Sequence, residues 1–268
     1  MNNNILKVEL RRAFLNWRWV LIVLFSIATY VISRSRYPAI GMAGEYAPNA
    51  VNRLMLIMEY GELSFLAPLL AGIPYADSFL SDIQTRSIDF MIFRTKRIKY
   101  IVSKLIAIAL SGGFAMVLIL LATFFIGSAK GIDLTPGIFI TGRVGAVEPL
   151  GPFAEVFSTN PSLYLIYMLI SAFGFGTTYA LFGTAMSMLF KNKFVGYALP
   201  LFFIQTIAFV SSRMFPVPWY LNPLQGLMPF DYSFSDENNL LYQFLQYLII
   251  LVPGIVITGG VFKRYGKK

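Results

Sequence analysis

Six long apolar runs, separated by shorter polar segments, dominate the pattern of this sequence. A membrane-spanning helix needs about 20 mainly apolar residues, and the runs are of that order. They are continuous rather than alternating, which indicates helices and not the strands of a β-barrel. The sequence therefore predicts an all-α membrane protein with one transmembrane domain over residues 1–268. Its six spans are expected at residues 17–33, 54–76, 105–127, 162–189, 194–212 and 240–262.

The second apolar run is the least regular of the six. Its clearly apolar part is too short to span a bilayer alone, so we extend it back to Leu54. This extension brings Glu59 and Glu62 into the outer portion of the span. Pro68 and Pro74 interrupt it, which membrane helices tolerate when neighbouring groups satisfy the freed carbonyls.

Composition agrees with a membrane protein, and the positions of the basic residues predict its orientation. The chain is 57% hydrophobic and 13% charged, whereas a soluble domain carries about a quarter charged residues. Of its 22 Lys and Arg, 16 lie before or at the start of the first span, in 77–104, in the turn 191–193, or after the last span. Cytoplasmic loops carry such an excess, so both termini are expected in the cytoplasm. Segments 34–53, 128–161 and 213–239 are then outer loops.

Several classes of chemistry are disfavoured by composition. The chain has no Cys and no His, which removes thiol chemistry, most zinc sites and Ser-His triads. It has no glycine-rich phosphate loop, so it cannot bind ATP by that route. We therefore expect no catalytic, metal or cofactor residues in this chain. The net charge of +9 is spread over four inner segments and needs no nucleic-acid partner.

Residues 2–16 are expected to form an amphipathic helix. Leu6, Leu10, Ala13 and Trp17 repeat at helical spacing, with basic residues on other faces. This pattern suits a helix that lies on the cytoplasmic membrane surface, where basic residues are attracted to anionic lipid. The alternative is a polar tail whose positive charge only orients the first span.

The segment 77–104 is the longest charged run of the chain. Ser81 to Gln84 reads as a capping box, which predicts a short helix that begins at Ser81. Asp82 then lies in its first turn, and Arg86 and Asp89 are spaced to pair on its surface. Phe79, Ile83 and Phe90 offer an apolar face. The segment is either a lever for a soluble partner or a solvated loop that only fixes the topology.

Three further features are candidates for a transport pathway or for helix packing. Glu59 and Glu62 are three residues apart and are expected on one helix face, where they line a pathway. The alternatives are that they lie in the outer headgroup layer, or that one of them pairs with Arg53. Gln205 either lines a cavity or makes a polar contact between helices. Small residues recur every four positions in the fourth span and favour close packing, within the chain or between subunits. They are Ala172, Gly176, Ala180 and Thr184.

Three local motifs of the sequence resemble those of a known protein family. They are the residues Asp82-Ile83-Gln84-Thr85-Arg86-Ser87-Ile88-Asp89-Phe90, Arg94-Thr95-Lys96-Arg97, Tyr100 and Ser103-Lys104 in the charged segment, Asn222-Pro223-Leu224 after the fifth span, and Phe262-Lys263-Arg264-Tyr265 near the end. With the six-span layout, they resemble the permease subunits of ABC exporters of the type-2 (ABC-2) family. The charged segment lacks the Gly, and the Pro before Ser-Arg, that are usual in that family.

The resemblance implies an ABC-2-type exporter fold with an N-terminal surface helix, and a coupling helix in 77–104. That helix would dock on a separate ATP-binding subunit, which would hold ATP and Mg. The resemblance also implies a second permease copy or a related permease in the same bilayer. The docking residues implied are Asp82, Gln84, Arg86, Asp89, Phe90, Arg94 and Arg97, and the pathway candidates remain Glu59, Glu62 and Gln205.

The expected function is that of a non-catalytic permease subunit in a bacterial plasma membrane. It would export an amphipathic substrate, such as a peptide or bacteriocin, a drug or a lipid. One alternative is a gradient-driven carrier, which should have broken helices and acidic residues near the bilayer midplane. Another is a membrane scaffold or immunity protein that transports nothing.

Overall fold

The computed structural model describes residues 4–36, 49–94, 96–129, 131–136, 153–213, 226–230 and 239–265. Every regular element within these residues is a helix. The helices are α1 (Asn4–Phe14), α2 (Arg18–Arg36), α3 (Ala50–Tyr60), α4 (Leu63–Gly72), α5 (Ser78–Gln84), α6 (Ser87–Arg94), α7 (Arg97–Gly127), α8 (Ala154–Thr159), α9 (Pro161–Phe190), α10 (Lys193–Arg213) and α11 (Asn239–Tyr265).

Five of these helices, α2, α7, α9, α10 and α11, are long and apolar enough to cross a membrane. They confirm the first, third, fourth, fifth and sixth predicted spans, although α7 begins at Arg97 rather than at residue 105. The protein is therefore a multi-pass α-helical membrane protein. Its long helices leave many large apolar side chains exposed, as lipid-facing surfaces require.

The second span is not the single helix that the sequence predicted. The axes of α3 and α4 meet at 85°, so the pair is a broken span or a re-entrant segment. Gly61 ends α3, and a Cβ there would collide with Thr29 of α2. Glu62 follows in a left-handed conformation, with φ 57°. The chain turns at these two residues because glycine allows a close contact that any larger residue would prevent.

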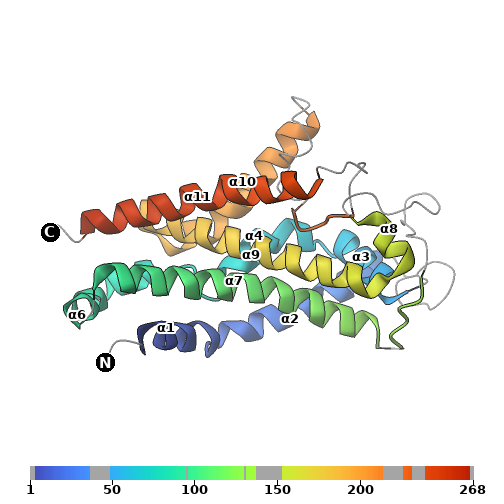
Figure 1. Ribbon diagram of the computed structural model, residues 1–268, viewed down its shortest axis with the longest axis horizontal. Coiled ribbons are helices and arrows are strands. Elements are labelled where there is room, and N and C mark those ends of the chain that lie inside the picture. The colour runs from blue at the N-terminus through green and yellow to red at the C-terminus, as the bar shows by residue number, and fades with distance from the viewer. Residues whose placement is uncertain are drawn as a thin grey trace.

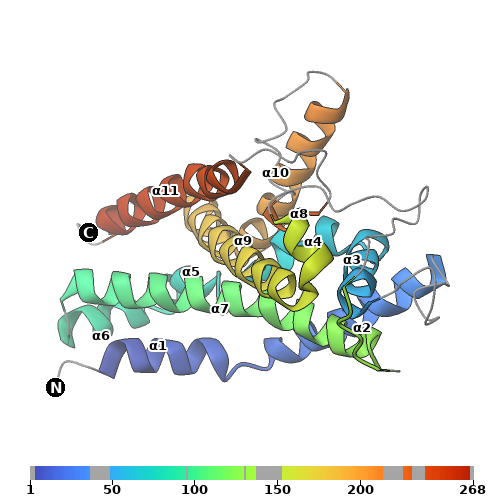
Figure 2. The same cartoon turned by 45° about the vertical axis from the view of Figure 1, so that its right-hand side comes forward.

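Most of the long helices run lengthwise beside one another and define two ends of the molecule, whereas α10 projects from them at an angle (Figures 1 and 2). At one end lie α6, the beginning of α1 and the end of α11; we call this the α6 end. The opposite end contains α3 and α8, and we call it the α3 end. α7 and α9 pack along much of their length, with α2 against α7 and α11 against α9 (Figure 2).

Two of the small residues of α9, Gly176 and Ala180, lie at its contact with α7. A Cβ on Gly176 would collide with the carbonyl oxygen of Gly112, and a Cβ on Gly112 would lie 2.6 Å from the carbonyl oxygen of Gly176. Ala172, Ala180 and Thr184 are buried on the same helix. The four-residue repeat therefore serves close packing inside this chain, the first of the two interpretations of the sequence.

The predicted N-terminal helix is present as α1, and its apolar face packs against the protein. α1 packs against α7, and both views show it alongside that helix rather than across it (Figures 1 and 2). Ala13 is buried and Leu10 packs beside it, whereas Trp17 lies beyond the helix and is 70% exposed. The apolar face thus covers protein, and Glu9 on that face has its partners inside the protein.

Candidate functional site

The charged segment folds into two short helices, α5 and α6, which we call the α5–α6 segment. The predicted start at Ser81 is wrong, because α5 begins at Ser78 and the carbonyl of Ser81 accepts a hydrogen bond from the Thr85 amide near the end of α5. The chain turns at Thr85 and Arg86, and Arg86 has a left-handed φ of 56°. Tertiary contacts of Asp82 outweigh the local capping signal here.

Asp82 lies inside the protein and binds three side chains from two other helices. Its carboxylate accepts hydrogen bonds from Arg12 of α1 at 2.9 Å and from the Tyr100 hydroxyl of α7 at 2.6 Å. It also forms a buried ion pair with Lys104 of α7. Asp82 is 2% exposed, so it stands apart from the surface residues with which the sequence grouped it.

The buried amine of Lys104 joins a second acid to this group. Its Nζ atom lies 3.6 Å from the Glu9 carboxylate, and both side chains are fully buried. Glu9 also accepts hydrogen bonds from Tyr75 at 2.6 Å and from Arg12 at 3.2 Å. We call the six residues the ion cluster. They are Glu9, Arg12, Tyr75, Asp82, Tyr100 and Lys104.

The ion cluster is electrically balanced and covered by aromatic rings. It has two acids and two bases, so each buried charge has an opposite partner, as burial requires. The rings of Phe79, Tyr100 and Phe262 pack together at centroid distances of 5.8 to 6.0 Å. Burial alone would raise the pKa of Asp82, but the Arg12 hydrogen bond and the charge of Lys104 lower it to about 2.

A second buried pair connects the start of α2 to the turn after α4. The guanidinium of Arg18 binds both oxygens of Asp77, at 2.6 and 3.0 Å, and also the carbonyl of Ile73 and the hydroxyl of Tyr197. Burial opposes ionisation of Asp77, yet the bidentate contact keeps its pKa below the ordinary value. Together with the ion cluster, this pair fixes α1, α2, α5 and α7 to one another at the α6 end.

An exposed surface lies beside these buried charges. Gln84 and Arg86 are exposed at the end of α5, and Phe90 of α6 is 73% exposed. Arg97 is exposed at the start of α7, followed by Ile98, which is 74% exposed. The predicted apolar face is thus divided, since Phe79 is buried and Phe90 points outward.

Some of the predicted site residues are not described. The side chains of Asp89 and Arg94 lie outside the described part of the structure, and so does their predicted pairing. The motif Asn222-Pro223-Leu224 also falls outside the described residues, as do the side chains of Lys263 and Arg264.

The predicted pathway residues do not form one site. The break between α3 and α4 separates Glu59 from Glu62, so the two do not share a helix face. Glu62 pairs with Arg36 at the end of α2, whereas the Arg53 guanidinium donates to the carbonyl of Gly131 at 2.9 Å. Gln205 is half-buried on α10.

The sequence contained one unused signal for the ion cluster. Glu9 lies four residues before Ala13, on the face of α1 that was otherwise read as apolar, and an acid there needs a buried partner. Lys104, at the edge of an apolar run, belongs to the charged segment and to the motif Ser103-Lys104, and neither feature predicts a buried ion pair. Within the described residues no group of three acidic side chains could hold a metal ion, and the cluster's hydrogen bonds are already made. These contacts connect α1, α5 and α7.

Comparison with known proteins does not extend this description. No protein-family model matches the chain, and no curated protein matches it.

Proposed function

We propose that this protein is the membrane-spanning permease subunit of an ATP-driven exporter of the ABC-2 type. In this proposal a separate ATP-binding subunit docks on the α5–α6 segment, and two permease subunits enclose the export pathway. The observation that supports it best is the combination of an exposed basic and apolar surface with buried ion pairs directly behind it.

The distribution of charge favours contact with a soluble partner at the α6 end. Arg86, Lys96, Arg97 and Lys99 are exposed there, and Phe90 gives the surface an apolar anchor. Arginine and aromatic residues contribute strongly to binding in protein interfaces. The positive charge also favours a cytoplasmic location for this end of the molecule.

The buried contacts explain how force on this surface would reach the membrane helices. Asp82 of α5 is bonded to Arg12 of α1 and to Lys104 of α7. Breaking the buried pair of Asp82 with Lys104 costs several kcal/mol, whereas the pair with Arg12, whose side chain is 40% exposed, contributes less. The buried pair of Lys104 with Glu9 also joins α7 to α1, so movement of α5 should displace the start of α7 and α1 with it. Movement of the docked ATP-binding subunit would therefore tilt two helices together.

One observation favours a gradient-driven carrier as a second candidate. The broken α3–α4 pair resembles the discontinuous helices of such transporters, whose acids lie near the bilayer midplane. However, Glu62 at the break pairs with Arg36, the last residue of α2, and so lies at the rim of the bundle. We therefore rank the carrier below the exporter.

Co-purification tests the proposed docking. The tagged permease is co-expressed with each ATP-binding ABC subunit of its source genome, and the retained subunit is quantified. We expect Phe90→Asp and Arg97→Glu each to reduce retention at least ten-fold, because both alter the exposed surface of the α5–α6 segment or the adjoining start of α7. Lys7→Glu makes the same charge change on exposed α1 and should have no effect. Retention by none of the subunits, or equal retention by all variants, would contradict the proposal.

A further inference from the structure

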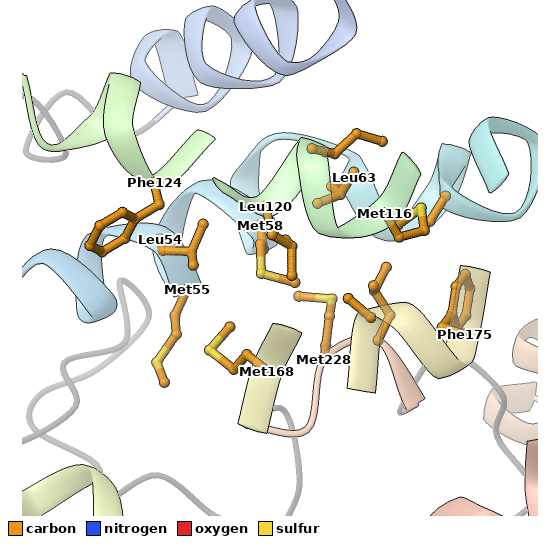
Figure 3. Packing of buried hydrophobic residues seen from close by; sticks show 14 of the residues in the cluster. Leu54, Met55, Met58, Leu63, Met116, Leu120, Phe124, Met168, Phe175 and Met228 are labelled. Carbon is orange, nitrogen blue, oxygen red and sulfur yellow. The ribbon is translucent and has the colours of Figure 1, made fainter. Parts of the chain in front are cut away.

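The largest apolar core of the protein contains an unusual concentration of methionine. Met55 and Met58 of α3, Met116 of α7, Met168 of α9 and Met228 of the segment 226–230 belong to it and are buried. We call these five residues the methionine cluster. In Figure 3, Met58, Met168 and Met228 meet near the centre, with Met55 and Met116 on either side. Four separate parts of the chain thus contribute flexible, unbranched side chains to one place.

Two buried polar groups beside this cluster have no hydrogen-bond partner. The hydroxyl of Tyr164 and both amide atoms of Asn52 are buried and unpaired within the described part of the chain. Tyr164 precedes Met168 by one helical turn, and Asn52 precedes Met55 by three residues, so each lies near a methionine of the cluster. An unpaired buried group costs about 1–3 kcal/mol, and native proteins rarely retain one without a reason.

The walls around the cluster are almost free of charge. α9, α7 from residue 105 onward and the segment 226–230 contain no charged residue. On α3, the guanidinium of Arg53 donates from Nη2 to the carbonyl of Gly131, beyond the end of α7, while its Nε is buried without a hydrogen-bond partner among the described residues, and Glu59 is only partly buried. A charged ligand among the methionines would have no charged partner on that part of α7, on α9 or on the segment 226–230, which is very unfavourable.

We propose that the methionine cluster is a binding site for a neutral molecule with a flat apolar body and one hydrogen-bonding group. The body lies among Met55, Met58, Met168 and Met228, and its polar group bonds to the Tyr164 hydroxyl, with the Asn52 amide as a second partner. Methionines repack at little cost, so they separate to admit the molecule and close again when it leaves. That such molecules are the substrates of the exporter rests on the proposed function. That the methionine cluster binds them does not.

Two probes that differ by one polar group test the site. The permease alone, in lipid nanodiscs and without any ATP-binding subunit, is titrated with fluorescent 1-aminoanthracene and with anthracene, and empty nanodiscs give the partition background. We expect saturable binding of 1-aminoanthracene. Tyr164→Phe should weaken it about five- to ten-fold, the usual effect of one hydrogen bond, and leave anthracene binding unchanged.

Matched variants separate binding from folding. Tyr179→Phe removes another buried, unpaired hydroxyl from α9, four helical turns away, and should change neither probe's affinity. Met168→Leu conserves volume but stiffens the side chain, and should weaken both probes several-fold in a folded protein. The proposal is overturned if 1-aminoanthracene does not bind above the lipid background, or if Tyr164→Phe leaves its affinity unchanged, which would indicate a bound water only. Because the ATP-binding subunit is absent, a failure here does not bear on docking.

Discussion

The ion cluster and the methionine cluster both lie inside the protein, but the polar groups of the first are hydrogen-bonded and, within the described part of the chain, those beside the second are not. In the ion cluster the Tyr100 hydroxyl and the Lys104 amine have close partners. Beside the methionine cluster, the Tyr164 hydroxyl has none among the described residues. Satisfied ion pairs hold helices in one arrangement, whereas methionines adapt to several. The comparison indicates a rigid connection at the α6 end and an adaptable interior towards the α3 end.

The largest expected effect comes from removing the buried base of the ion cluster. Lys104→Met leaves Asp82 and Glu9 sharing only Arg12, so we expect a loss of about 3–5 kcal/mol in the free energy of unfolding. Thermal unfolding of the purified protein in detergent measures it. Asp82→Asn added to Lys104→Met should restore part of the loss, because it removes the unmatched charge. If Lys104→Met alone unfolds like the wild type, the cluster does not stabilise the fold.

Acid should remove the contribution of Asp82 selectively. Its pKa is about 2 in the folded protein and 3.8 ordinarily, so its carboxylate stabilises the fold above pH 3.8 and loses that effect as the pH falls towards 2. The difference corresponds to about 2 kcal/mol. Unfolding free energies measured between pH 5 and pH 2 should fall more steeply for the wild type than for Asp82→Asn. Parallel curves would mean that the Asp82 carboxylate is not preferentially stabilised in the folded state.

A smaller effect is expected at the contact of α7 with α9. Gly176→Ala places a methyl group against the carbonyl of Gly112, and should cost about 1–3 kcal/mol because two backbones must separate. Gly260→Ala is the control, since no described atom lies within 4 Å of its added Cβ and alanine favours the helix. Melting temperatures should fall for the first variant and stay level or rise for the second. The reverse order would contradict the packing described here.

The smallest expected changes in stability come from removing one tyrosine hydroxyl in or beside each cluster. Because the two changes should differ in direction, they test the contrast between the clusters most sharply. Tyr100→Phe removes the hydrogen bond to Asp82 and should destabilise the protein by about 1–2 kcal/mol. Tyr164→Phe removes an unpaired hydroxyl and should leave stability unchanged or raise it by about 1 kcal/mol. Both are measured by chemical unfolding under identical conditions. Equal losses in the two variants would remove the distinction between the clusters.

The membrane spans were predictable because hydrocarbon imposes a length and an apolar composition on each crossing helix. Five of the six predicted spans are single helices in the structure for that reason. Hydropathy carries no information on the direction of a helix axis, however, so it did not reveal the turn at Gly61 and Glu62 within the extended second span. The contact of Gly61 with Thr29 of α2, 32 positions away, explains why the chain turns there.

The charged segment was evident in the sequence, but the burial of Asp82 within it was not. The charged segment was recognised from its charges alone, and Gln84, Arg86, Phe90 and Arg97 are exposed as a docking surface requires. The burial of Asp82 could not be predicted, because its partner Arg12 lies 70 positions away and helical spacing gives no guidance over such a separation. The methionine cluster was missed for the same reason, since its members come from four parts of the chain.

Arg12 provides the most direct test of the claim that the ion cluster transmits movement. Arg12→Gln cuts the bridge from α1 to Asp82 but retains the pair of Asp82 with Lys104, and Arg11→Gln is a matched control on the exposed face of α1. Binding of the ATP-binding subunit and ATP hydrolysis by the assembled complex are measured in nanodiscs. We predict that Arg12→Gln binds normally but hydrolyses ATP several-fold more slowly than Arg11→Gln. Equal binding and equal hydrolysis in the two variants would contradict the account.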